Sequence, residues 1–155
     1  FKAHIANAVR AQDLKEAFLA DIDHDTAAFN AIMDAIKLPK KNAAEQAVRQ
    51  EAMTAATKLA INVPLRVLER SVDAIACAEV AATGNTNARS DAGVAALTAK
   101  AAAEGAFYNV LINMDGFADA EFAADARSRA EAALATITER ADALTSAIRN
   151  ELRAH

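Results

Sequence analysis

The feature of this sequence that most constrains its fold is its alanine content. Alanine supplies 44 of the 155 residues, whereas there are only 4 glycines and 2 prolines. Alanine has the highest helix propensity, and strand-rich folds need many turns built from glycine and proline. Hydrophobic residues make up 54% of the chain, which is enough to form a core and excludes a disordered protein. The composition therefore predicts an all-α protein.

Three short breaks divide the helical pattern, at residues 38–42, 83–87 and 114–119. The expected helices span residues 2–22, a segment capped by Asp25-Thr26 that ends at 37, residues 43–82, about fifteen residues from Asn87 or Ser90, and residues 119–153. We expect Pro64 to kink or split the helix over 43–82, because proline removes a backbone donor.

The length and the helix pattern predict a single domain over residues 1–155, an antiparallel bundle of long helices. Alanine-rich faces bury little apolar area per helix, so we expect association into homodimers or larger homo-oligomers. The first residue is Phe1 rather than Met, which we interpret as a fragment or a processed product.

The charge pattern argues against two classes of partner. The 17 basic and 21 acidic residues are mixed along the chain, so no basic stripe indicates a nucleic acid, and no apolar run indicates a membrane span. Cys77, the only cysteine, cannot form an internal disulfide and is expected to be a buried thiol. No signal peptide is visible, so we expect a cytoplasmic protein.

An acidic cluster at residues 21–26 is the first candidate site. Asp21, Asp23 and Asp25 repel one another, which raises the proton affinity of at least one carboxylate and suits acid–base chemistry. The alternative is helix capping by aspartate. His24 has no second histidine one turn away, so no metal site is expected.

Amides and cations near the breaks form the other candidates. Asn109 and Asn113 lie four residues apart among apolar neighbours, so each is expected to bond to backbone or to a ligand. Pro64 frees the carbonyl of Ala60, and such groups sometimes line a site. Cations that could bind an anionic ligand, or serve structural roles, are Lys40, Lys41, Arg66 and Arg89, with Asp91 beside Arg89.

Several of these segments occur together, in order, in one known family. They are residues 23–30 (DHDTAAFN), 38–40 (LPK), 63–65 (VPL), 84–85 (GN), 89–91 (RSD) and 109–113 (NVLIN). The sequence resembles the cyclodeaminase domain of formiminotransferase-cyclodeaminase over about residues 18–150, and the related bacterial methenyltetrahydrofolate cyclohydrolases share the pattern.

The resemblance implies an all-helical, dimeric enzyme that acts on tetrahydrofolate carrying a one-carbon unit, with or without a polyglutamate tail. It implies no metal and no cofactor beyond this substrate. The reaction converts 5-formiminotetrahydrofolate to 5,10-methenyltetrahydrofolate and ammonia. Family members also have an upstream helical segment rich in glycine and small residues, and because this sequence begins after it, we expect a fragment or a shortened homologue.

The resemblance also implies roles for particular residues. The second aspartate of the Asp-x-Asp element is the catalytic one, which corresponds to Asp25, with Asp23 as the first. The expected substrate-binding residues are Lys40, Arg66, Arg89, Asp91, Asn109 and Asn113, the cations for the glutamate tail and the amides for the pterin edge.

Two alternatives to the cyclodeaminase stay open. In a methenyltetrahydrofolate cyclohydrolase, water attacks the methenyl carbon at a similar site. The segments 89–91 and 109–113 are closer to the bifunctional enzymes and favour the cyclodeaminase. The other alternative is a catalytically silent helical module that binds folate or only a partner helix.

Overall fold

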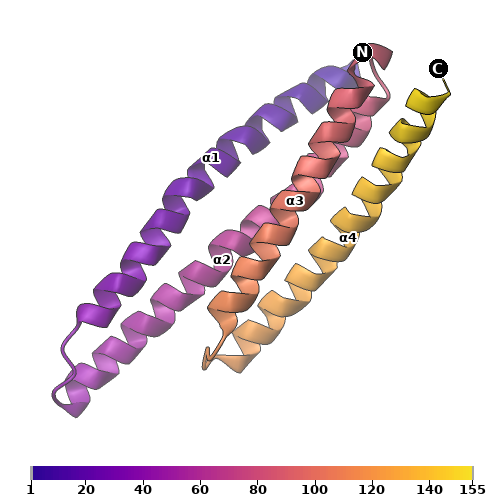
Figure 1. The fold of residues 1–155 in the computed structure, drawn as a ribbon. Helices are drawn as coiled ribbons and strands as arrows, with labels where there is room; N and C mark the ends of the chain where they lie inside the picture. Colours follow the sequence, from indigo (N-terminus) through magenta and orange to yellow (C-terminus); the bar gives the residue numbers. More distant parts are fainter. Residues whose placement is uncertain (1, 155) are drawn as a thin grey trace.

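The computed structural model describes residues 2–154, which form four long α-helices and no strand (Figure 1). The helices are α1 (Lys2–Lys37), α2 (Ala43–Ala82), α3 (Arg89–Met114) and α4 (Ala120–Arg153), with a short 3-10 helix η1 (Thr86–Ala88) before α3. The all-α prediction is confirmed. None of the helices within residues 2–154 has a stretch long and apolar enough to cross a membrane.

The helix α2 is the centre of the arrangement. It packs against α1, α3 and α4, and α3 also packs against α4. Within residues 2–154, α1 packs only on α2, and Figure 1 shows α1 apart from α3 over most of its length. Two cavities lined by residues of α1, α2 and α3 lie between α1 and α3, and we call this region the trough.

The core consists of a few large side chains and many alanines. Ile61, Leu65, Leu68 and Ile75 of α2 pack with Val110 of α3 and Ile137 of α4, and all six are almost fully buried. Helix α1 contributes only Asp21, Ala28 and Ala35 as buried residues, and the partly buried Ile32 packs beside Ala28 against Ala60 and Val63 of α2.

The predicted break near residue 25 is wrong, because α1 is continuous over 36 residues. The hydroxyl of Thr26 donates to the carbonyl of Ile22 at 3.1 Å, as a threonine within a helix does. The acidic cluster thus lies inside a helix, and its aspartates cap nothing. Aspartate lowers helix propensity by less than about 0.7 kcal/mol, which does not end a helix without a glycine or proline nearby.

Pro64 does not split α2, which runs unbroken from Ala43 to Ala82. The carbonyl of Ala60, which Pro64 leaves without its usual donor, accepts a hydrogen bond from the side-chain nitrogen of Asn113 at 2.7 Å. An amide from α3 thereby replaces the backbone N–H that proline lacks, and it also ties α3 to α2.

Helix α3 has 26 residues, not the expected fifteen, and it continues through Gly105. Neither Asn87 nor Ser90 caps it, contrary to our expectation. Instead, the side chain of Asn85 accepts from the backbone of Asn87 at 3.0 Å and caps η1, which leads into α3. Helix α4 begins at Ala120 as predicted, with Asp119 accepting from the backbone of Phe122 at 3.1 Å.

We predict that Asn113→Ala lowers the free energy of unfolding by about 1–3 kcal/mol, because it leaves the buried carbonyl of Ala60 without a donor. In a Pro64→Ala background the backbone supplies an N–H to that carbonyl, so the same substitution should cost clearly less. Urea unfolding of the two single variants and the double variant measures this coupling.

The matched control is Asn109→Ala. Asn109 is exposed and bonds to the carbonyl of Gly105 in its own helix, so its loss should cost under about 0.5 kcal/mol. An equal cost of Asn113→Ala with and without Pro64 would show that the two residues are not coupled.

Candidate functional site

A cavity of about 450 Å³ opens between α1, α2 and α3, and we call it the Asp25 cavity. Its walls hold two carboxylates, Asp21 and Asp25, which lie one helical turn apart on the same face of α1. The other lining residues are Phe18, Ile22 and Thr26 of α1, Val63, Pro64 and Val67 of α2, and Ala102, Ala106 and Asn109 of α3.

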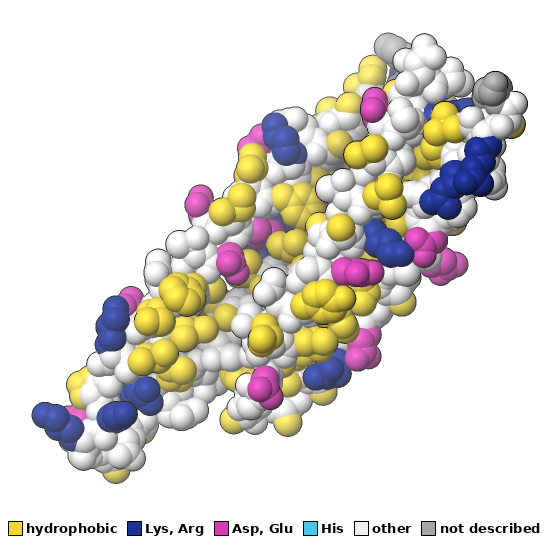
Figure 2. Space-filling model, in the orientation of Figure 1, with side chains coloured by type: hydrophobic (Ala, Val, Ile, Leu, Met, Phe, Trp, Pro, Cys, Tyr) yellow, Lys and Arg dark blue, Asp and Glu magenta, His cyan; other side chains and the backbone are white. Residues whose placement is uncertain are grey.

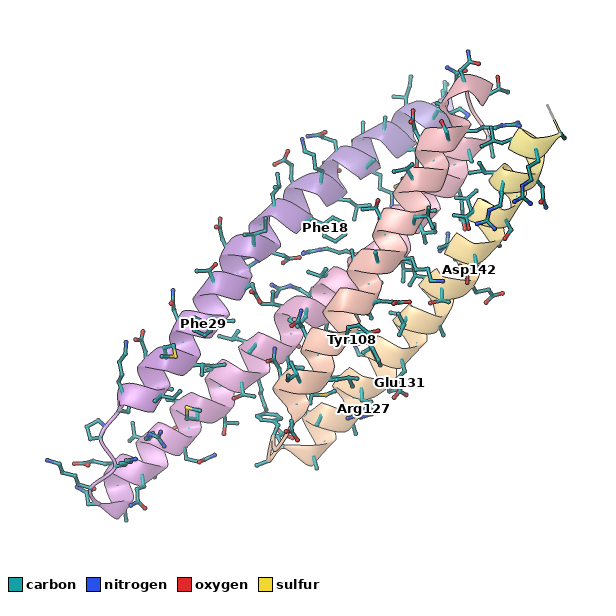
Figure 3. The ribbon with its side chains drawn as sticks, viewed as in Figure 1. Phe18, Phe29, Tyr108, Arg127, Glu131 and Asp142 are labelled. Atoms are coloured by element: carbon teal, nitrogen blue, oxygen red, sulfur yellow. The ribbon has the colours of Figure 1, made fainter. Side chains whose placement is uncertain are left out.

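Asp25 and Asn109 lie on opposite walls of this cavity. Asp25 comes from α1 and Asn109 from α3, and both side chains are accessible to solvent. Between them, α2 contributes an apolar floor at Val63, Pro64 and Val67. Figure 3 shows Phe18 reaching from α1 across the trough toward α3. The cavity thus combines an apolar floor with a carboxylate and an amide that can contact a ligand.

Asp21 lies at the inner edge of the cavity and is only 3% exposed. One of its carboxylate oxygens pairs with Arg70, and the other with Arg66 at 3.2 Å and with Nδ1 of His24 at 3.2 Å. Arg70 also donates to the carbonyl of Ala17 at 3.4 Å. A single carboxylate of α1 therefore holds two guanidinium groups of α2.

This arrangement sets the charge state of Asp21. Burial raises the pKa of the carboxyl, but hydrogen bonds from Arg70 and His24, the positive charge of Arg70 and the hydrogen bond from Arg66 together lower it below its ordinary 3.8. Asp21 is consequently ionised at neutral pH. Asp21 is therefore not a carboxylate of the acidic cluster whose proton affinity is raised.

A larger, apolar groove of about 690 Å³ continues along the same trough and shares Phe18 and Ile22 with the Asp25 cavity. Figure 2 shows apolar side chains gathered in this hollow. It is larger than the Asp25 cavity, but no carboxylate lines it. Cys77, at its floor, is buried as predicted, and burial raises the pKa of its thiol. Of these two cavities, the smaller one is lined by carboxylates.

The structure brings four of the predicted site residues to this region. Asp25 and Asn109 line the cavity, Arg66 pairs with Asp21 beside it, and Asn113 bonds to the carbonyl of Ala60 below it. Asn113 therefore bonds to backbone, one of the two partners that its sequence context suggested. Asp23 is exposed on α1 and is not among the residues that line the cavity.

The other predicted residues lie at the two ends of the molecule. Lys40 and Lys41 are exposed in the turn between α1 and α2, where the backbone N–H of Lys41 donates to Glu45. Arg89 and Asp91 begin α3, and Arg89 pairs with Glu151 of α4. Asp91 is about 27 Å along α3 from Asn109 at 1.5 Å per residue. Within one chain, none of them lines the Asp25 cavity.

Sequence reasoning missed the central place of Asp21 and of Arg70. Three aspartates at alternate positions gave no indication of which one faces α2, because the segment was expected to lie at a helix end. The available signal was the pair Arg66 and Arg70, one helical turn apart within an apolar segment of α2. Two cations on one face of a half-buried helix call for a buried acidic partner.

Comparison with known proteins places this chain in a family. Residues 3–132 match the formiminotransferase-cyclodeaminase family. The chain belongs to this family. A relative named methenyltetrahydrofolate cyclohydrolase, from Methylorubrum extorquens, is 37% identical over 127 residues, which is 81% of this chain and 61% of the relative.

Other relatives of this chain are animal proteins named formimidoyltransferase-cyclodeaminase. The pig protein is 37% identical over 109 residues and the chicken protein 33% identical over 108 residues, which is 70% and 69% of this chain. The chain spans 61% of the length of the bacterial relative and 20% of these two.

We predict that Asp21→Asn destabilises the protein at neutral pH much more than at low pH. The folded protein holds the pKa of Asp21 below its unfolded value, so the stabilisation is present above about pH 4 and disappears as the pH falls through the folded pKa. At pH 7 the loss should be about 1–3 kcal/mol. Urea unfolding between pH 7 and pH 2 measures it.

The control is Asp73→Asn, which removes the exposed pair of Asp73 with Arg10 between the same two helices. Such a pair contributes about 0–1 kcal/mol. If the free energies of unfolding of Asp21→Asn and the natural chain differed by the same amount from pH 7 to pH 2, the ion pair of Asp21 with Arg66 and Arg70 would be contradicted.

Proposed function

We propose that this chain interconverts one-carbon units on tetrahydrofolate, with Asp25 as the group that moves the proton. The observation that carries the proposal is the position of Asp25, the carboxylate accessible to solvent in a cavity between three helices. The family and the names of its relatives indicate the substrate class. The proposal extends these indications to this chain.

The predicted reaction is that of a formimidoyltetrahydrofolate cyclodeaminase. N10 of the folate attacks the formimino carbon, and the proton of N10 passes to the formimino nitrogen. That nitrogen takes up a second proton from solvent and leaves as ammonia. A carboxylate beside both nitrogens can carry this proton, which typically accelerates such a step by about 10²–10⁴-fold. The 5,10-methenyl product is a cation, which an ionised carboxylate also stabilises. No electrons are transferred, so we propose no cofactor beyond the tetrahydrofolate substrate.

The walls of the cavity suit parts of this substrate. Phe18, Val63 and Val67 offer apolar surface for a flat ring, and Asn109 offers an amide for the pterin edge. Arg66 is partly exposed next to Asp21 and could receive a glutamate carboxylate. We keep Lys40, Arg89 and Asp91 as proposed binding residues that would act from a second copy of the chain.

A methenyltetrahydrofolate cyclohydrolase is the second candidate. The observation that favours it is the relative of that name, which this chain matches over 81% of its length. Here water attacks the methenyl carbon, and Asp25 would accept a proton from that water. Both reactions use the same carboxylate and the same cavity.

We also propose that the chain forms a homodimer. Several large apolar side chains of α1 and α3 are exposed: Ile5, Val9, Leu19, Ile22 and Phe29 of α1, and Val94, Leu97, Tyr108 and Ile112 of α3. Of these, Leu19 and Ile22 line the trough. Apolar surface of this extent marks an association site.

We expect Asp25→Asn to lower kcat by about 10²–10⁴-fold, because the amide cannot carry the proton. Helicity should be unchanged, because Asp25 is exposed and makes no ion pair among those found in residues 2–154. Asp23→Asn is the matched comparison, since Asp23 lies outside the cavity, and it should have the smaller effect. Full activity of Asp25→Asn would refute the proposed role.

Two assays distinguish the candidate reactions. Release of ammonia from 5-formiminotetrahydrofolate would identify a cyclodeaminase. Loss of methenyl absorbance with formation of 10-formyltetrahydrofolate, without ammonia release, would identify a cyclohydrolase. Folate binding by calorimetry without either turnover would favour the silent module and refute both enzymes.

Light scattering tests the proposed homodimer. We expect a mass of about twice 16.3 kDa at micromolar concentration. Replacing Ile112, an exposed side chain of α3, with a charged residue should weaken association without unfolding the chain. A monomer at micromolar concentration would count against the proposal.

A further inference from the structure

Helix α1 carries the proposed catalytic aspartate, but few apolar contacts fix its rotation near that residue. Its buried residues are Asp21, Ala28 and Ala35, and α2 is the only helix against which it packs within residues 2–154. The apolar cluster with α2 forms after the acidic segment, where Ala28 and the partly buried Ile32 pack against Ala60 and Val63. Alanine methyl groups make few contacts, so beside the cavity the rotation of α1 depends on directional polar contacts.

Asp21 makes the strongest of these contacts. Its two carboxylate oxygens hold Arg70 and Arg66, which stand one turn apart on α2, and such charge-assisted bonds have narrow angular tolerance. Two guanidinium groups on one buried carboxylate fix both the rotation of α1 and its position along α2. The other polar contacts between these helices are weaker or distant from the cavity, such as Asn7 to the carbonyl of Cys77 and the exposed pair of Arg10 with Asp73.

Asp25 follows Asp21 by one helical turn on the same face of α1. A rotation of α1 by about 35° would move a side-chain atom 5 Å from the helix axis by roughly 3 Å, enough to carry the carboxylate of Asp25 away from the wall opposite Asn109. We propose that Asp21 is a positioning residue, which through Arg66 and Arg70 sets the rotation of α1 and so directs Asp25 into the cavity. The catalytic consequence rests on the proposed function, whereas the structural one does not.

The first test measures the rotation of α1 without any folate chemistry. Nitroxide labels at Asn30→Cys on α1 and Thr98→Cys on α3, both exposed, report the distance between these helices in a Cys77→Ala background of the 155-residue chain. Asp21→Asn should shift or broaden the distance distribution by about 3 Å or more. Asp73→Asn, which removes an exposed ion pair between the same helices that does not line the Asp25 cavity, should leave it unchanged.

The second test measures turnover in whichever folate assay the natural chain supports. Asp21→Asn should lower kcat by about 10- to 100-fold and change KM by less than threefold, as expected when a reacting group is misplaced by an ångström or more. Asp21→Glu, which keeps the charge, should recover part of the loss. The fall of kcat toward low pH should persist in Asp21→Asn, because Asp25, the proposed proton carrier, is still present.

The outcomes separate the two proposals. An unchanged distance distribution in Asp21→Asn, or full kcat in that variant while Asp25→Asn is inactive, would overturn the positioning role. If the fall of kcat toward low pH disappeared in Asp21→Asn, the positioning role would also be overturned, since Asp21 would then carry the proton itself. If the natural chain shows no turnover, the proposed function fails and the label distances alone decide. If Asp21→Asn does not fold, Arg70→Gln should give the same distance change.

Discussion

The buried carboxylate of Asp21 between Arg66 and Arg70 is the interaction on which the arrangement of the candidate site depends. It joins α1 to a group of three other helices that pack among themselves. A buried charge without partners would cost several kcal/mol, so this carboxylate cannot leave its two guanidinium groups at neutral pH. Because it lies one turn from Asp25, the contact that orients α1 also orients the aspartate that we propose as the proton carrier.

Small side chains make such polar contacts important throughout the chain. Alanine lets helices approach closely but provides few contacts that define one rotation or register. Directional bonds take over that task at several places: Asn113 satisfies the carbonyl that Pro64 frees, Asn7 bonds to the carbonyl of Cys77, and Arg140 holds Glu79 between α4 and α2. The same small side chains leave the trough between α1 and α3 unfilled, and the Asp25 cavity is one part of it.

The sequence predicted some elements well because local chemistry decided them. Helix α4 follows an aspartate cap and carries apolar residues at steps of three and four, so its bounds agreed within one residue. The break near residue 25 was wrong because Asp25-Thr26 looked like a helix cap, and α3 was expected to be too short. The energy of one unfavourable residue is small compared with that of a long packed helix.

The sequence by itself determined that the chain is helical, because alanine content and scarce turn residues depend on no long-range contact. It also indicated the family, through short segments in a fixed order, and it selected Asp25 and Asn109. Only the tertiary structure decided which polar residues meet. It separated Lys40, Arg89 and Asp91 from the cavity, assigned Asn113 to a backbone carbonyl, and buried Asp21 against Arg66 and Arg70. Those outcomes depend on the rotation and register of one helix on another. A hydrophobic pattern with a period of 3.6 residues does not determine that rotation and register when most of its apolar positions are alanine.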